Sequence, residues 1–178
     1  RKKLRAGRPH LLEFYNCSRV ELAGVTLRDS PFWTVHPVYS EHVHIHHATL
    51  RAPLYSPNTD GIDPDSCRDV LIEHCDISVG DDHVAIKAGI GELARASFPR
   101  FVSEDVVVRH NTLRTGMGVS VGSETSGGIR RVHVHHNTFL GDGGWSVALH
   151  VKTSPRRGNM VEDVAFTRLA DGSVQMRW

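Results

Sequence analysis

The stretch Val70-Leu71-Ile72-Glu73-His74-Cys75-Asp76-Ile77 carries the pattern that decides the fold. A valine is followed by an apolar residue two positions later and by another seven positions later. Apolar residues two positions apart are what a strand with one buried face requires. The polar residues around His74 then indicate a turn before a second short strand.

The same pattern recurs along the chain, and its leading valines stand 23 to 36 residues apart. The copies are Val20-Leu22-Leu27, Val43-Ile45-Leu50, Val70-Ile72-Ile77, Val106-Val108-Leu113, Val132-Val134-Phe139 and a weaker Val164-Phe166. Short strands that repeat at this interval predict a solenoid, in which stacked coils pair in parallel and share one core.

We therefore expect an all-β chain folded as a parallel β-helix. A β-sandwich or jelly roll is the alternative, but its turns come every 8 to 12 residues without such in-phase repetition. The segment 90–101 lies in the longest step and is predicted to be a loop inserted into one coil. The weak last copy indicates a solenoid that is truncated.

The composition of the chain excludes several classes of protein. Its 178 residues carry 21 basic and 20 acidic side chains, a balance that argues against a nucleic-acid-binding protein. No apolar run is long enough for a membrane helix. The three cysteines, Cys17, Cys67 and Cys75, fit no metal spacing and are expected to be small buried residues. We expect a monomer that binds neither nucleic acid nor membrane.

Three carboxylates stand in unusual surroundings. Asp60 ends the stretch Ser56-Pro57-Asn58-Thr59-Asp60, while Asp81 and Asp82 lie in Gly80-Asp81-Asp82-His83. Both stretches follow strands of consecutive coils, so stacking can bring the side chains together. Their mutual repulsion should then raise at least one pKa, as in the acid–base pair of a glycosidase. The plainer alternative, that Asp beside Gly builds a turn, is expected for Asp63 and Asp65.

A cation and several histidines complete the set of candidates. Lys152 follows a later strand, and beside three carboxylates it would suit an acidic sugar. His83 directly follows the acidic pair and is expected to line the same cleft. The alternating histidines, His42, His44, His46, His133 and His135, are interpreted as an exposed ladder, since no Cys or carboxylate completes a four-ligand zinc set. The sequence therefore predicts no metal site.

Three tripeptides taken together resemble a known family. Asn58-Thr59-Asp60, Gly80-Asp81-Asp82 and His150-Val151-Lys152 look like the ordered signatures N-T-D, G-D-D and R-I-K of glycoside hydrolase family 28, the polygalacturonases. The similarity runs from about Arg8 to Gly158. It implies a right-handed parallel β-helix with more coils on the N-terminal side. Residues 1–178 would then be one pectinase-like domain, a fragment of a longer catalytic domain that acts outside the cell or in the periplasm.

The resemblance also implies a reaction and the roles of particular residues. It implies inverting hydrolysis of α-1,4-linked galacturonic acid or a related pectic chain. Exo action is one mode compatible with the resemblance, and the reaction needs no cofactor. Asp81 would be the general acid, and Asp60 and Asp82 would activate the attacking water. The residues implied in substrate binding are Asn58, His83, Met117, Glu124, His150 and Lys152.

Two departures from the family pattern keep other functions open. Met117 replaces the histidine of a G-H-G signature, and His150 replaces the arginine of R-I-K. A catalytically impaired β-helix that binds acidic polysaccharide and a calcium-dependent pectate lyase are therefore the alternatives. For an inverting enzyme we expect acid and base carboxyl groups roughly 6.5–9.5 Å apart. We also expect a turn or bulge at Gly80-Asp81-Asp82, so that both aspartates face one cleft.

Overall fold

Parallel strands stacked coil upon coil form the body of the computed structural model, which describes residues 7–141, 148–167 and 176–177. One sheet contains the long strands β2 (Ser18–Ala23), β5 (Glu41–His46), β7 (Arg68–Glu73), β10 (Ser103–Arg109), β13 (Ile129–His135) and β16 (Val161–Thr167), with β17 (Met176–Arg177) antiparallel at its edge. A second sheet contains the short strands β3 (Thr26–Arg28), β6 (Thr49–Arg51), β8 (Asp76–Ser78), β11 (Thr112–Leu113) and β14 (Thr138–Phe139).

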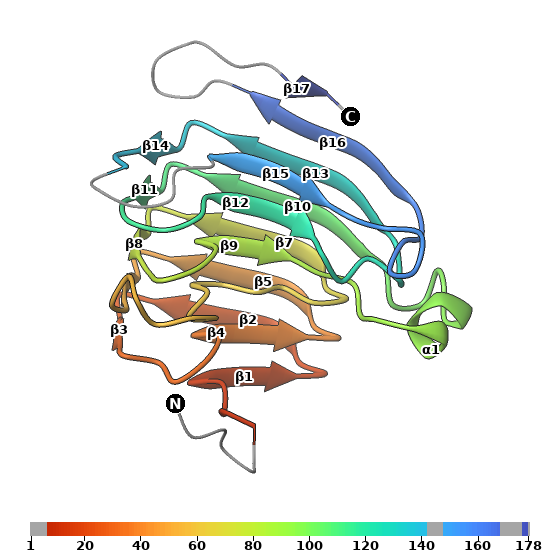
Figure 1. Ribbon diagram of the computed structural model, residues 1–178, viewed down its shortest axis with the longest axis horizontal. Helices are drawn as coiled ribbons and strands as arrows, with labels where there is room; N and C mark the ends of the chain where they lie inside the picture. Colours follow the sequence, from red (N-terminus) through yellow and green to blue (C-terminus); the bar gives the residue numbers. More distant parts are fainter. Residues whose placement is uncertain (1–6, 142–147, 168–175, 178) are drawn as a thin grey trace.

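A third face of the stack is built from strands that the repeat did not reveal. They are β1 (Leu12–Tyr15), β4 (Val35–Val38), β9 (Val84–Ile86), β12 (Val119–Gly122) and β15 (Leu149–Lys152). Single bridges at Ile62 and Asp65 join β4 to β9, so this face, which we call the third sheet, is continuous from coil to coil. Figure 1 shows the strands rising from β1 near the N-terminus to β16 at the opposite end.

The repeated apolar positions stack on one another and form the core. Val43 pairs with Val20 on one side and with Val70 on the other, and the row continues through Val106, Val132 and Val164. The second apolar position of each copy forms a parallel row of the same kind. Burial of these rows is the main force that holds the coils together.

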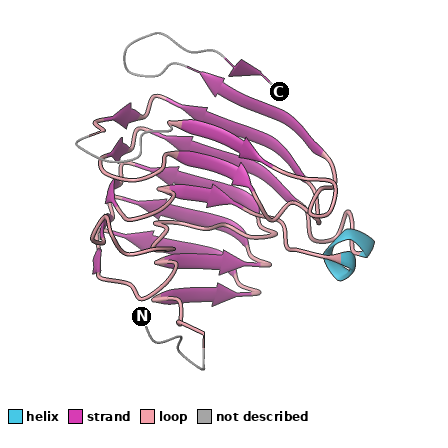
Figure 2. Ribbon diagram, viewed as in Figure 1, coloured by secondary structure: helices cyan, strands magenta, loops and turns pink. Residues whose placement is uncertain are grey.

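The expectation of a right-handed parallel β-helix is confirmed. The inserted segment 90–101 is also found, but it contains a short helix, α1 (Glu92–Ala96), rather than loop alone. Figure 2 shows this helix, in cyan, beyond one end of the strands. No helix in the described residues is long and apolar enough to cross a membrane.

Polar residues inside the turns replace hydrogen bonds that the strands cannot make. The buried Asn111 accepts a hydrogen bond from the backbone N–H of Cys75 at 2.9 Å, and Asn137 accepts one from the N–H of Asn111 at 3.0 Å. Cys67 and Cys75 are buried free thiols, as expected, whereas Cys17 is half-buried. The side chains of Asn111 and Asn137 thus satisfy backbone donors that would otherwise be buried without a partner.

The alternating histidines point away from the core, as expected. His42 and His133 are exposed, and His44 and His46 are partly exposed. At the following turn the rings of His47, His74, His110 and His136 stack in sequence, with centroids 5.1–5.3 Å apart.

The third sheet has outward positions that carry polar side chains. Its register continues from Leu12 through Val35, Ile62, Val84 and Val119 to Leu149. One residue further along each strand lies an outward row formed by Glu13, His36, Asp63, Ala85, Ser120 and His150. Side chains far apart in sequence therefore lie next to one another on this face.

Candidate active site

The three candidate carboxylates converge on the outer side of the third sheet. Asp60 lies two residues before Ile62 and Asp82 two residues before Val84, so the register sets them side by side in neighbouring coils. Asp60, Asp81 and Asp82 each offer one carboxylate oxygen within 4.8 Å of the other two. The expected convergence is confirmed.

The nearest oxygens of the three carboxylates lie close together, within 4.8 Å of one another, while the separation expected between the acid and base carboxyl groups stays a prediction. A separation of roughly 6.5–9.5 Å was expected for an inverting pair. The residues come from directly stacked coils, and paired strands lie only about 4.8 Å apart. The close spacing is therefore a consequence of the fold, and any attacking water must fit among the carboxylates.

The backbone turns at Gly80 and Asp81, as the sequence predicted. These two residues form a bend between β8 and β9. A Cβ atom on Gly80 would lie 2.3 Å from the carbonyl oxygen of Ser56, so only glycine fits against the neighbouring loop. Asp81 is half-buried, and its two oxygens accept the backbone N–H groups of Asn58 at 3.1 Å and Asp82 at 3.0 Å.

Asp82 is buried and held by side chains from two later coils. Its Oδ2 accepts a hydrogen bond from Lys152 Nζ at 2.5 Å, and its Oδ1 accepts one from Ser120 Oγ at 2.7 Å. His150 Nε2 lies 3.6 Å from Oδ1 and donates to the carbonyl oxygen of Met117 at 3.1 Å. Ser120 was not singled out from the sequence, although its place in the outward row beside Ala85 gives it room to reach Asp82.

Burial keeps a proton within the carboxylate cluster near neutral pH. Asp60 is only 3 % exposed, and burial, followed by the charge of Asp81, raises its pKa to about 7. Burial, followed by the charge of Asp60, also raises the pKa of Asp63 well above its usual value. A carboxyl that keeps its proton up to a pH of about 7 is what general acid catalysis near neutral pH needs.

Replacing Asp60 by Asn should change how stability depends on pH. Since the pKa of Asp60 is about 7 folded and 3.8 unfolded, the folded state binds the extra proton between these values. The wild type should therefore lose stability as pH rises from about 4 to about 7. The Asn variant lacks this loss. Relative to its value at low pH, the difference in the free energy of unfolding between variant and wild type should therefore shift in favour of the variant by as much as roughly 4 kcal/mol above pH 7. Urea unfolding at pH 5 and pH 8 measures the difference.

Asp76→Asn is a control for this experiment, because the pKa of Asp76 is lowered rather than raised. A hydrogen bond from Arg114 is the first cause that lowers this pKa from 3.8, so the contribution of Asp76 to stability is fully present above that value and is lost only on further acidification. The difference in the free energy of unfolding between the Asp76 variant and the wild type should therefore be the same at pH 5 and pH 8. An Asp60→Asn difference that is the same at both pH values would contradict the burial of a titrating Asp60.

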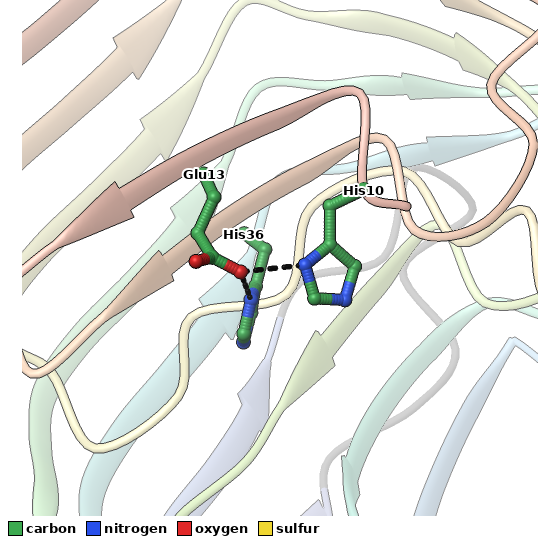
Figure 3. Close-up of side chains that lie close together, drawn as sticks. All are labelled: His10, Glu13 and His36. Carbon is green, nitrogen blue, oxygen red and sulfur yellow. Dashed lines mark hydrogen bonds and ion pairs between the residues drawn. The ribbon is translucent and has the colours of Figure 1, made fainter. Parts of the chain in front are cut away.

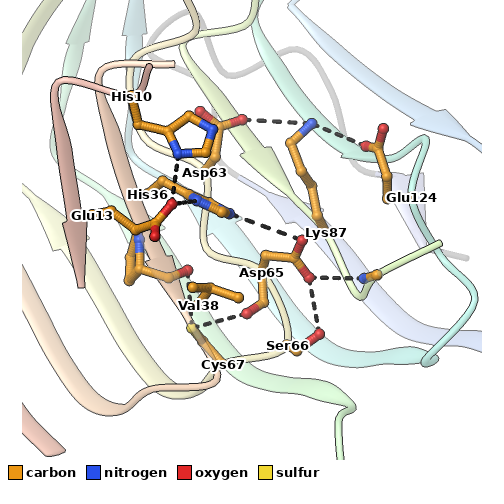
Figure 4. A network of polar contacts seen from close by, with 12 residues as sticks. His10, Glu13, His36, Val38, Asp63, Asp65, Ser66, Cys67, Lys87 and Glu124 are labelled. Carbon is orange, nitrogen blue, oxygen red and sulfur yellow. Dashed lines mark hydrogen bonds and ion pairs between the residues drawn. The ribbon is translucent and has the colours of Figure 1, made fainter. Parts of the chain in front are cut away.

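Lys87 is a buried cation next to the carboxylates. The sequence did not decide whether its side chain points toward the site or away from it. Its Nζ atom is 3.1 Å from Glu124 Oε2, 3.5 Å from Asp63 Oδ1 and 4.4 Å from the centre of the Trp33 ring. Figure 4 shows Lys87 between Asp63 and Glu124. Asp63 was expected only to build a turn, but it is fully buried in this network.

His83 is buried beneath the neighbouring loop rather than on the open face. It is 2 % exposed, and a Cβ atom on Gly116 would lie 2.6 Å from its ring. Its Nδ1 accepts the N–H of Gly118 at 2.9 Å, and burial lowers its pKa to about 4, so the ring is neutral. The expectation that His83 lines the cleft is therefore corrected: its geometry suits positioning of the Gly116–Gly118 loop.

The remaining predicted substrate-binding residues surround the carboxylates. Asn58 is exposed, and its Oδ1 accepts a hydrogen bond from Arg8 at 2.7 Å. Met117 is half-buried at the level of Asp82, where the family signature has a histidine, and its N–H donates to the Asp81 carbonyl at 2.9 Å. Glu124 is paired with Lys87 and lies 3.8 Å from Arg157. Contact of these residues with substrate stays a prediction.

Fold and site together define a class of protein. The class is a parallel β-helix with a cluster of aspartates and cations on one outer face. Comparison with known proteins agrees with this assignment. A family model described as glycosyl hydrolases family 28 matches residues 1–171. The chain belongs to glycosyl hydrolases family 28.

Relatives from plants and bacteria are similar over most of the chain. It is 38 % identical over 165 residues to a probable polygalacturonase of Vitis vinifera, and the matched region covers 91 % of this chain and 32 % of that protein. It is also 38 % identical over 170 residues to an endo-polygalacturonase of Pectobacterium carotovorum subsp. carotovorum, covering 94 % of this chain and 39 % of the relative. The chain thus spans a third or slightly more of these relatives' length.

Solved structures show the same fold. The crystal structure of a hyperthermoactive exopolygalacturonase from Thermotoga maritima superposes with a TM-score of 0.78 at 36 % identity, covering 91 % of this chain and 38 % of that one. The polygalacturonase from Erwinia carotovora ssp. carotovora gives 0.73 at 31 % identity, covering 86 % and 39 %.

Proposed function

We propose that the protein containing this chain hydrolyses α-1,4-linked galacturonic acid, or a related pectic polysaccharide, by an inverting mechanism. The observation that carries the proposal is the convergence of Asp60, Asp81 and Asp82 beside Lys152. The relatives named polygalacturonase support the same reaction and substrate.

The spacing of the carboxylates suits a single water molecule. A water that donates two hydrogen bonds of about 2.8 Å at a tetrahedral angle spans acceptors about 4.6 Å apart. One oxygen from each of the three carboxylates lies within 4.8 Å of one oxygen of the other two, so a single water can reach two of them. In the proposed mechanism Asp60 and Asp82 hold and deprotonate this water, which attacks the anomeric carbon from the face opposite the leaving group.

Asp81 is proposed to protonate the leaving oxygen. It is the most exposed of the three carboxyls, and its oxygens accept only backbone N–H groups among the described residues, so a glycosidic oxygen can reach it. The proton that burial keeps on Asp60 up to a pH of about 7 belongs to a set of interacting carboxyls. In the proposed mechanism, binding of substrate moves this proton to Asp81.

An acidic substrate matches the cations around the cluster. Lys152 is about one-third exposed, and only one of its three donors is used by Asp82. Arg157 is also exposed, close to Glu124. We propose that these groups bind sugar carboxylates, that the protein acts as a monomer, and that it works outside the cell, where a pectic polymer is accessible.

A calcium-dependent lyase is the main competing reaction. Three carboxylates can bind a cation, but here Lys152 Nζ already lies 2.5 Å from Asp82, and a second positive charge at that position would be repelled. The pairing therefore favours hydrolysis.

Activity of the full-length protein on polygalacturonate tests the proposal. New reducing ends should appear in the presence of excess chelator, without an unsaturated product that absorbs in the ultraviolet. Release of unsaturated product that stops on chelation would indicate the lyase. Binding of the polymer without any cleavage would indicate the impaired, binding-only β-helix.

A further inference from the structure

A second cluster of polar side chains lies on the third sheet, in the two coils that precede the coil of Asp60. It consists of His10, Glu13 and His36, and the carboxylate and ring atoms that these residues offer lie within 4.8 Å of one another. Glu13 and His36 are neighbours in the outward row of β1 and β4. Figure 3 shows both histidine rings directed at one carboxylate oxygen of Glu13.

The three donor atoms are close to the arrangement of a metal site. Nδ1 of His10 is 2.6 Å and Nδ1 of His36 is 3.2 Å from Glu13 Oε2. In tetrahedral zinc coordination, ligand atoms about 2.0–2.1 Å from the ion lie about 3.3 Å from each other. The observed distances differ from this value by less than about 1 Å, so small rotations of the side chains would open room for the ion.

The surroundings hold the rings in place. The His10 ring stacks on Trp33, with centroids 5.2 Å apart and planes inclined by 9°. His36 is only 7 % exposed. Glu13 is the exposed member, and hydrogen bonds from His10 first and His36 second lower its pKa, so it is ionised at neutral pH.

The hydrogen bonding of His36 is incomplete without an ion. If both Nδ1 atoms donate to Glu13, the neutral His36 ring turns the lone pair of Nε2 toward Asp65 Oδ2, 3.9 Å away. Nε2 has no hydrogen-bond partner within the described part of the chain. Asp65 Oδ1, by contrast, accepts hydrogen bonds from Ser66 Oγ and the N–H of Gly89.

A metal ion would remove this mismatch. With Nδ1 of His36 bound to the ion, the ring carries its proton on Nε2. That proton faces Asp65 Oδ2, which is 3.9 Å from Nε2 (Figure 4). Histidines that bind metals almost always direct their other N–H at a carboxylate, a carbonyl or water.

We propose that His10, Glu13 and His36 bind one divalent transition-metal ion of the zinc class, linking β1 to β4. Three protein ligands leave at least one coordination position for water or another oxygen ligand. The proposal does not depend on the proposed hydrolysis. No metal site was predicted from the sequence, where the only histidine candidates were those that alternate along a single strand.

Titration of the metal-free, full-length protein with Zn²⁺ tests the proposal by calorimetry. Wild type should show one tight site, and Glu13→Gln should weaken it at least tenfold while leaving this exposed position folded. His36→Gln should have the same effect, with circular dichroism to verify its fold. Bound Co²⁺ should give visible absorption bands in wild type that are lost in both variants.

His44→Gln is the matched control. Glu21, His44 and His46 form a similar but more exposed group on the long-strand sheet. Tight binding should persist in this variant. The proposal is overturned if the wild type has no tight site, if Glu13→Gln and His36→Gln leave it unchanged, or if only His44→Gln removes it.

Discussion

Replacing Asp81 by Asn should lower kcat on polygalacturonate by a factor of at least about 10² to 10⁴, the usual contribution of general acid–base catalysis. Asparagine has nearly the same shape but cannot donate a proton to the leaving oxygen. The amide oxygen can still accept one of the two backbone N–H groups that the carboxylate accepts, and Gly80 is unchanged, so the bend should survive. Initial rates of reducing-end release by the full-length protein measure the effect.

Asp69→Asn is the control for Asp81→Asn. Asp69 is an exposed residue of β7, on a different sheet from the carboxylate cluster. Its replacement should leave kcat within about twofold of the wild type, because it contacts none of the three catalytic candidates. Near-full activity of Asp81→Asn, with unchanged circular dichroism, would show that Asp81 is not the general acid.

Replacing Lys87 by Met should destabilise the fold by about 3–5 kcal/mol, because it leaves buried carboxylates without their cation. Lys87 is 4 % exposed and Asp63 is fully buried. Neither oxygen of Asp63 has a hydrogen-bond partner in the part of the chain that the structure describes. The charges of Asp63, Glu124 and Asp60 outweigh the effect of burial and raise the pKa of Lys87, so the side chain stays protonated.

Arg157→Met is the matched control for Lys87→Met. Arg157 approaches the same Glu124 at 3.8 Å, but its side chain is 44 % exposed. Exposed ion pairs contribute about 0–1 kcal/mol, so this variant should stay within that range in urea unfolding. Equal losses in the two variants would mean that Lys87 does not act as a buried counter-ion.

The sequence predicted two of the three faces of the solenoid. Val70, Ile72 and Ile77 mark one coil because their apolar side chains recur in step with the long and short strands. The third face escaped because β4, β9 and β12 are only three or four residues long and are buried at every position, outward ones included. Periodicity over so few residues cannot distinguish a strand from another buried segment.

The site was predictable to the extent that short motifs fix it. The neighbourhoods of Asp60, Asp81 and Asp82 were recognisable, and the turn at Gly80 followed from the need for both aspartates to face one side. The direction of Lys87 and the burial of His83 were not predictable, because a shift of one residue in register reverses the face of a side chain. The separation of the carboxylates depends on coil stacking, which no local pattern encodes.

The His10, Glu13 and His36 cluster was missed for a related reason. His36 stands 23 residues after Glu13 in the sequence, and the two become neighbours only through the pairing of β1 with β4. Spacing rules for metal ligands apply to residues within one local element, and they do not detect ligands from successive coils.

Proton NMR of the first product tests the central claim most directly, since it reports the reaction and its stereochemistry together. The full-length protein would be mixed with an α-linked oligogalacturonide and followed from the earliest times. If Asp60 and Asp82 direct a water against the bond that Asp81 protonates, the β-anomer of the new reducing end should appear first and convert slowly to the equilibrium mixture. An α-anomer appearing first, or an unsaturated product in place of a reducing end formed by water, would contradict the mechanism.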